Sequence, residues 1–193
     1  MEAIFIEGET FDNYNFKENP LTKGSYEDCN FINCDFSDAN FSLISFSDCS
    51  FVGCNLSLVK LGDTALRDIA FKDCKILGLH FEHCNKMALS FSFENCILNH
   101  SSFFKMRIKK TVFKNSPLQE VDFTGCDLTE ANFDNCDLTN AHFENTILEK
   151  ADFRTAINFV IDPEINKIKK AKFSLSGVAG LLNKYDIAID ITS

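Results

Sequence analysis

Residues 121–138 read V-D-F-T-G, C-D-L-T-E, A-N-F-D-N, C-D-L, and this stretch decides the fold. A large apolar residue, Phe or Leu, recurs every five positions, and we call it the centre of each repeat. The residue two before a centre is small or apolar, the residue one before it is often Asp or Asn, and the two after it are mostly polar. All nine cysteines lie two before a nominal centre: Cys29, Cys34, Cys49, Cys54, Cys74, Cys84, Cys96, Cys126 and Cys136.

A period of five excludes a regular helix and a continuous strand. On an α-helix, five residues advance the chain by about 500°, so the centres would spiral around every face. On a strand, an odd period would place successive centres on opposite faces. Only a chain that turns at each repeat can direct every centre inward, together with the residue two before it. The sequence therefore predicts an all-β solenoid with one continuous core.

The repeats resemble those of the pentapeptide-repeat proteins. Good matches are C-D-F-S-D at residues 34–38, A-N-F-S-L at 39–43, C-D-L-T-N at 136–140 and A-D-F-R-T at 151–155. This resemblance implies a right-handed quadrilateral β-helix with four repeats, or about 20 residues, in each coil. We expect the β-helix to occupy residues 1–158 and a capping or dimerisation segment, a short helix and a strand, to occupy residues 159–193.

One irregularity interrupts the repeat. Centres fall on numbers ending in 1 or 6 up to Phe81, and on numbers ending in 3 or 8 from Leu98 onward. The extra two residues predict a bulge or short loop within residues 85–94, near Lys86 and Met87, with Phe91 or Phe93 resuming the core. A tolerated solenoid bulge and a protrusion that contacts a partner are both consistent with this insertion.

The cysteines favour packing over chemistry. Every thiol is expected to point inward, where cysteine behaves as a compact hydrophobic residue. The odd count and the mixed, acidic N-terminus argue against disulfides and secretion, and the spacing of five is not that of a zinc site. No apolar run is long enough to span a membrane. We therefore expect a cytoplasmic protein with neither metal nor cofactor.

Catalytic motifs are absent from the sequence. It contains no phosphate-binding loop, nucleophile elbow or zinc-protease motif. With 20 residues in a coil, His142 would stack one coil above Asp122, which predicts a surface contact rather than an acid–base pair. The sequence therefore indicates that the chain is not an enzyme.

Charge gives the first indication of function. The formal net charge is −9, yet residues 105–119 contain five basic and no acidic side chains. We expect this basic stretch to pair with acids on neighbouring coils. The acids sit on outward positions, and rows of them at coil spacing would give a rigid negative rod able to occupy a basic cleft built for DNA. The acids expected to contact such a partner are Asp122, Asp127, Asp137, Asp152, Glu130 and Glu144, and no direct contact with nucleic acid is expected.

The C-terminus departs from the repeat. Ser174 is a candidate helix N-cap, and Leu175, Val178, Ala179, Leu182 and Tyr185 form an apolar stripe at helical spacing. Ile187, Ile189 and Ile191 alternate as in a short strand. This ending looks like the C-terminal module of the Qnr-like quinolone-resistance proteins, which are similar to the microcin-immunity pentapeptide proteins. The resemblance implies a homodimer formed through Leu181, Leu182, Ile187 and Ile189, and the alternative is an intramolecular cap over the last coil.

The same resemblance implies that the protein mimics DNA and binds a type II topoisomerase, DNA gyrase or topoisomerase IV. Such a protein would protect the enzyme from a quinolone or a peptide toxin, or would inhibit it. The chain has only a two-residue insertion where the best-known protective members carry sizeable loops, which leaves protection and inhibition open. The alternative is a non-enzymatic scaffold or interaction module for another protein, because this fold serves many functions.

Overall fold

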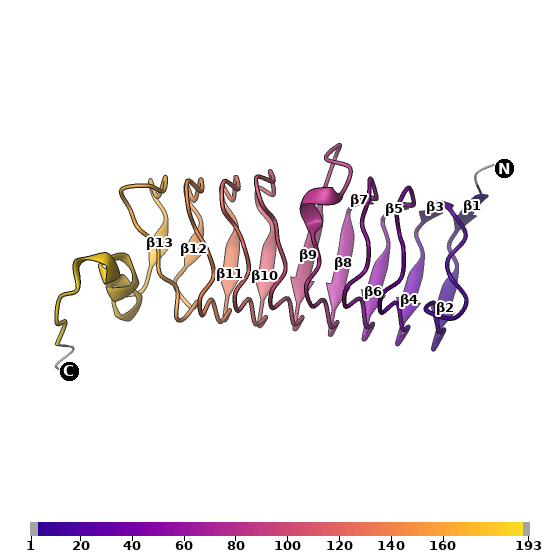
Figure 1. Cartoon of the computed structure of the whole chain (residues 1–193), viewed down its shortest axis with the longest axis horizontal. Coiled ribbons are helices and arrows are strands. Elements are labelled where there is room, and N and C mark those ends of the chain that lie inside the picture. The colour runs from indigo at the N-terminus through magenta and orange to yellow at the C-terminus, as the bar shows by residue number, and fades with distance from the viewer. Residues whose placement is uncertain (1–3, 191–193) are drawn as a thin grey trace.

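The computed structural model describes residues 4–190, which form a parallel β-solenoid (Figure 1). Four strands line one side in the order β1-β3-β5-β7: β1 (Ile4–Glu7), β3 (Gly24–Glu27), β5 (Ser45–Ser47) and β7 (Ala65–Arg67). Nine strands follow one another along a second side: β2 (Thr10–Asp12), β4 (Asn30–Ile32), β6 (Ser50–Val52), β8 (Ile69–Lys72), β9 (Phe91–Glu94), β10 (Val112–Lys114), β11 (Asn132–Asp134), β12 (Asp152–Phe153) and β13 (Lys172–Phe173). The fold is the all-β solenoid that the repeat predicted, in the right-handed quadrilateral form that the family resemblance implied.

Consecutive coils stack in register with an offset of 20 residues. Phe31 lies opposite Phe51 in the β4–β6 pair, and Phe113 lies opposite Phe133 in the β10–β11 pair. The rings of these two pairs are parallel, with centroids 4.8 and 5.1 Å apart. Because each coil repeats the same apolar pattern, the centres form columns of stacked side chains in the interior.

The cysteines pack inside the solenoid beside these columns. All nine are buried and free. Thiols other than that of Cys84 donate to backbone carbonyls, as in the bond from Cys34 Sγ to the Phe11 carbonyl oxygen (3.3 Å). Burial raises the pKa of the Cys126 and Cys136 thiols to about 12, so the thiol form is strongly favoured.

Among the phenylalanines that match no centre, Phe5 and Phe104 are exposed, whereas Phe159 is buried. The Phe159 ring packs at a tilt against Phe153 and Phe173 and so belongs to the end of the core. The repeat pattern did not place Phe159 inside, because it lies one residue after the position that the register marks.

The predicted insertion forms a protrusion after the short 3-10 helix η1 (Phe81–His83). It rises above β9 in Figure 1. The backbone N–H of Asn85 still donates to the preceding coil, and that of Ser90 resumes the contact. The two extra residues therefore lie between Asn85 and Ser90, within the predicted interval.

Side chains within this protrusion separate into outward and inward groups. Lys86 and Met87 are exposed, and 72% of Met87 is accessible to solvent. Leu89 packs against the core instead of Lys86, while Phe91 and Phe93 are both buried. The wall is thus interrupted, but the core continues through it.

The C-terminal segment differs from the prediction. Two 3-10 helices, η2 (Ser176–Leu181) and η3 (Asn183–Tyr185), replace the expected α-helix, and residues 186–190 form no strand. Ile191, the third residue of the predicted alternation, lies outside the described residues. The Ser174 hydroxyl accepts the Gly177 N–H (3.1 Å), so this serine does satisfy a donor at the start of the helical segment.

This segment closes the end of the solenoid. The Ile161 N–H donates to the Gly180 carbonyl (3.0 Å), and Leu181 packs against the core. A Cβ on Gly180 would collide with the Phe159 carbonyl oxygen, so glycine is required for this close approach. The intramolecular cap that we considered as an alternative is therefore present.

Candidate partner-binding surface

The four predicted aspartates do not form one row. Across the coils, Asp122 lies next to His142, Asp127 next to Ile147, Asp137 next to Ile157 and Asp152 next to Asn132. Since a coil has 20 residues, these four positions fall on four different sides of the solenoid. These four aspartates therefore do not stack on one another at coil spacing, whereas the predicted stacking of His142 on Asp122 is confirmed. Their role in binding a partner stays a prediction.

These aspartates build the turns of the repeat. In each case the carboxylate oxygen Oδ1 accepts the backbone N–H two residues later: Asp122 from Thr124 (2.8 Å), Asp127 from Thr129 (3.2 Å), Asp137 from Thr139 (3.1 Å) and Asp152 from Arg154 (3.2 Å). Such side-chain bonds stabilise a turn by replacing a backbone acceptor. The Asp or Asn that precedes each centre thus has a structural reason to be there.

Hydrogen bonding also stabilises the charged form of these groups. Partial burial opposes ionisation of Asp137, but the bonds from Thr139, Gln119 and Asn158 prevail and lower its pKa to about 2. For Asp152, the bond from the Arg154 guanidinium is the main cause that lowers the pKa to about 2. The negative charges of Asp137 and Asp152 are therefore stabilised by hydrogen bonds from neighbouring residues of the same chain.

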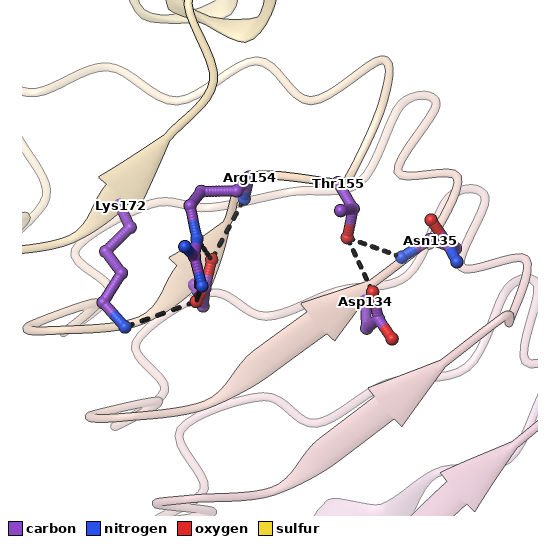
Figure 2. A network of polar contacts seen from close by, with 6 residues as sticks. Asp134, Asn135, Arg154, Thr155 and Lys172 are labelled. Atoms are coloured by element: carbon purple, nitrogen blue, oxygen red, sulfur yellow. Dashed lines mark hydrogen bonds and ion pairs between the residues drawn. The ribbon is translucent and has the colours of Figure 1, made fainter.

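Several acids of the C-terminal half are paired within the chain. Arg154 and Lys172 contact the carboxylate of Asp152, at 2.8 and 3.3 Å, and Figure 2 shows these two basic side chains converging. In the same view, the Thr155 hydroxyl donates to Asp134 (2.9 Å) and accepts the Asn135 N–H (2.9 Å). These contacts neutralise Asp152, one of the acids that the sequence suggested for a partner, and occupy its neighbour Asp134.

The basic stretch forms the predicted pairing patch across coils. Lys109 contacts Asp127 (3.1 Å), Lys114 contacts Glu94 (2.8 Å) and Lys110 contacts Glu130 (3.9 Å). Glu130 also pairs with Lys150 at 2.7 Å. Of the six predicted acids, Glu144 is the one whose whole residue is exposed, and the described part of the chain offers it no ion pair.

An acidic row does exist, in the N-terminal half. Asp28, Asp48 and Asp68 occupy the same corner of three consecutive coils, immediately before β4, β6 and β8. All three are exposed and have left-handed φ angles of 51°, 53° and 52°. Among residues 4–190 none of them takes part in an ion pair, so their charge faces solvent. We call these three residues the acidic corner.

Two glutamates extend the negative charge of the acidic corner. Glu7 and Glu27 lie opposite each other in the β1–β3 pair, and the Gly8 N–H, at the corner below Asp28, donates to the Glu27 carbonyl oxygen (3.0 Å). Within the N-terminal half, before the insertion, Arg67 is the single basic residue in that column. The spacing of 20 between Asp28, Asp48 and Asp68 was visible in the sequence and is the signal that could have identified the corner.

The predicted dimerisation residues divide into two groups. Leu181 belongs to the cap, whereas Ile187 and Ile189 are 55% and 45% exposed. Leu182 and Ile189 line a pocket of about 540 Å³ together with Leu175 and Val178. Leu175 is 93% exposed, so the end of the rod presents a contiguous apolar face.

Other kinds of site are not evident in the part of the chain that the structure describes. No three His, Cys, Asp or Glu side chains within residues 4–190 are arranged to hold a metal ion. Likewise, none of the helices described there has the length and apolar character needed to cross a membrane.

Comparison with known proteins establishes the family. The model of the pentapeptide repeat region matches residues 25–92 and 79–153, and the chain therefore belongs to the pentapeptide-repeat family. No curated protein matches the sequence. Among solved structures, HetL, a pentapeptide-repeat protein involved in heterocyst differentiation regulation from the cyanobacterium Nostoc sp. strain PCC 7120, is 16% identical, with a TM-score of 0.58 over 91% of this chain and 88% of that one. A trypsin-treated form of QnrB1, a plasmid-mediated fluoroquinolone resistance protein, is 20% identical, with a TM-score of 0.48 over 97% of this chain and 98% of that one.

Proposed function

We propose that this protein mimics DNA, binds a type II topoisomerase (DNA gyrase or topoisomerase IV) and modulates it, protecting it from a quinolone or a peptide toxin. The acidic corner is the observation that carries this proposal. It gives a rigid, straight row of carboxylates whose charges are not neutralised within the described chain. The protein acts by binding and not by catalysis.

The spacing of the corner suits a cleft that binds DNA. Stacked coils place one carboxylate about every 4.8 Å, and Glu7 and Glu27 add charge beside the row. One strand of duplex DNA carries a charge about every 3.4 Å along its axis. A basic cleft that accepts such a strand would therefore meet a comparable density of negative charge, which favours association through complementary potentials.

The apolar end of the rod supports a second part of the proposal. Leu182, Ile187 and Ile189 would join two copies of the chain through their C-terminal ends, while Leu181 holds the cap in place. Burying such exposed apolar side chains stabilises an interface by roughly 25 cal/mol for each Å² removed from water. Dimerisation and capping are compatible, because they use different side chains of the same segment.

The first experiment is DNA supercoiling by gyrase, and in parallel decatenation by topoisomerase IV, with the purified protein titrated in the presence and absence of ciprofloxacin. Restored activity in the drug would identify a protective protein, and inhibition without the drug would identify an inhibitory DNA mimic. The triple variant D28N/D48N/D68N should lose either effect, since it removes the row and keeps side chains that suit the backbone.

A matched control exists on the other three corners. Asp38, Asp63 and Asp73 also have left-handed φ angles, so D38N/D63N/D73N makes the same change of charge on different edges. This control should retain the effect of the wild-type protein. Equal loss in both triple variants would show that total charge matters and not the acidic corner.

The alternative is a scaffold or interaction module for another protein. The internal pairing of Asp127, Glu130 and Asp152 favours it, because paired acids offer little charge to a basic partner. No effect on either topoisomerase, with wild-type protein and at low salt, would select this alternative.

A further inference from the structure

The edge that carries the acidic corner reverses its charge along the rod. Its corner positions are Asp28, Asp48 and Asp68 in the N-terminal half, and Lys110, Glu130, Lys150 and Lys170 in the C-terminal half. Five of these corner N–H groups donate to the coil above, as from Asp48 to Arg67 (2.9 Å) and from Lys150 to Lys169 (3.0 Å). Asp68 and Lys110 line one shallow pocket with Ser90, which places both halves on the same edge across the insertion.

Charged residues beside the corner positions add to the charge of each half of the edge. Beside the acidic corner lie Glu7 and Glu27, opposed only by Arg67. Beside the basic half lie Lys109 and Lys169 in the column that precedes the corner, together with Glu149. One half of the edge is therefore negative and the other half positive.

We propose that this edge pairs with the same edge of a second copy of the chain, antiparallel, around a two-fold axis at the protrusion of residues 85–90. Only the antiparallel arrangement sets each acidic half against a basic half, since a parallel one would place like charges together. An interface of this kind is isologous and closes as a dimer. It is distinct from the apolar end of the rod.

The coil spacing makes the two edges match level by level. With the axis at the protrusion, Asp68 faces Lys110 of the second copy, and Asp28 faces Lys150 of the second copy. Gly8, flanked by Glu7, faces Lys170 of the second copy. The one unfavourable level sets Asp48 against Glu130 of the second copy. Glu130 also binds Lys110 and Lys150 of its own chain, so in the dimer these two lysines are shared between Glu130 and the aspartates of the other copy. Each match occurs twice by symmetry.

The protrusion supplies the centre of this interface. It stands above β7, between the Asn85 N–H that donates to Thr64 and the Ser90 N–H that donates to Leu66, and it borders this edge at Ser90. Met87, with 72% of its surface exposed, would meet its symmetry mate there. The exposed Lys86 stands beside it, so the centre combines one apolar and one charged side chain, with complementary charges on either side.

Such a dimer would cover the acidic corner. Self-association and binding of a basic partner would then exclude each other. The concentrations of protein and salt would therefore set the fraction of molecules whose acidic corner is free to bind. The pairing itself does not depend on the identity of that partner, and it stands or falls independently of the topoisomerase proposal.

A charge-swap experiment tests the pairing. The variant D28K/D48K/D68K makes the whole edge basic, and K110E/K150E/K170E makes it acidic. The backbone tolerates both changes, because Lys105 and Glu120 already occupy corners with left-handed φ angles of 55° and 56°. Circular dichroism and thermal unfolding would verify that both variants fold.

Sedimentation velocity at low and high salt is the measurement. We expect the wild-type protein to associate through this edge at low salt and to lose that association at high salt, where charges are screened. Each variant alone should lack the salt-sensitive species, and an equimolar mixture should regain it as a heterodimer. The C-terminal apolar face is identical in all samples, so its contribution does not change with mixing. D38K/D63K/D73K, which reverses the other three corners, should associate as the wild type does.

Two results would overturn the proposal. One is a mixture that sediments as the sum of its two variants. The other is wild-type association that either variant retains, which would assign it to the C-terminal face alone.

Discussion

The turn-building role of the aspartates before each centre leads to a direct test at Asp127. Its Oδ1 accepts the Thr129 N–H (3.2 Å) and the Thr129 hydroxyl (2.6 Å), and its Oδ2 pairs with Lys109 (3.1 Å). Asp127→Ala removes all three contacts. A net hydrogen bond contributes about 1 kcal/mol and a surface ion pair about 0.5 kcal/mol, so losing two hydrogen bonds and one ion pair should lower the free energy of unfolding by about 2.5 kcal/mol.

Asp127→Asn is the informative partner of this variant. The amide oxygen still accepts the Thr129 N–H, and only the ion pair with Lys109 is lost, so the cost should be about 0.5 kcal/mol. Urea unfolding followed by circular dichroism measures both values, provided that the dependence on urea is unchanged. Glu144→Ala, at an exposed position, should change stability by no more than about 0.5 kcal/mol.

A specific pattern would refute the reasoning. If Asp127→Ala and Asp127→Asn were equally stable, the turn bond would contribute nothing, and the preference for Asp or Asn before a centre would need another explanation. The outcome also bears on function: reversing these aspartates to Lys would perturb the turns, so loss of partner binding in such variants would not identify a binding surface.

Three further predictions follow from the described contacts. The pKa values of Asp137 and Asp152, about 2, lie below those of aspartates in an unfolded chain. The two ionised carboxylates therefore stabilise the folded state fully above about pH 4, and this contribution is lost as the pH falls toward 2. The melting temperatures of the wild type and of D137N/D152N, measured between pH 7 and pH 2, should converge at the acid end. Phe113→Ala, in a fully buried column, should cost about 3–5 kcal/mol by urea unfolding, whereas Phe104→Ala, at a partly exposed site, should cost less than about 1 kcal/mol. The nine buried thiols should react with a disulfide reagent only after denaturation, and rapid labelling of the native protein would contradict the burial described here.

The repeat predicted the core because it reports one property well, namely which residues face inward. Every coil requires an apolar centre and a small residue two before it, and both requirements are written in each five-residue unit. The same reasoning located the insertion, since two extra residues must shift the register. Phe159 was missed because it packs against the end of the core under Gly177 and Gly180, where no further repeat follows.

The five-residue unit does not show which side of the rod an outward residue occupies. Only the spacing of 20 does, and on that spacing Asp122 and Asp127 lie on different sides while Asp28 and Asp48 lie on the same corner. Acids chosen by their place in the unit, such as Asp122 and Asp127, therefore do not stack on one another from coil to coil.

The C-terminal segment was predicted less well for two reasons. Leu175 and Val178 are three residues apart, a spacing that suits a 3-10 helix as well as an α-helix, whereas the step of four from Val178 to Leu182 suits the α-helix that did not form. The alternation of Ile187 and Ile189 requires a neighbouring strand to become one, and residues 186–190 have none in the described chain. The periodicity of apolar residues shows which side chains share a face, but whether a segment pairs as a strand depends on tertiary contacts.

The fold does not require negative charge at the acidic corner. Corner residues adopt a left-handed conformation, which Asp, Asn and Gly reach most readily. In this chain the same conformation is also found for Leu43 and Leu58 at other corners and for Lys110 at this one. The next corner along the coil holds Asn33 and Gly53 at the same levels as the acidic corner. Asparagine adopts this backbone conformation equally well. The conformation therefore does not explain three successive aspartates at one corner, whereas a role for their negative charge does. Neutralising them should therefore leave stability nearly unchanged, which makes the acidic corner a place where function can be separated from folding.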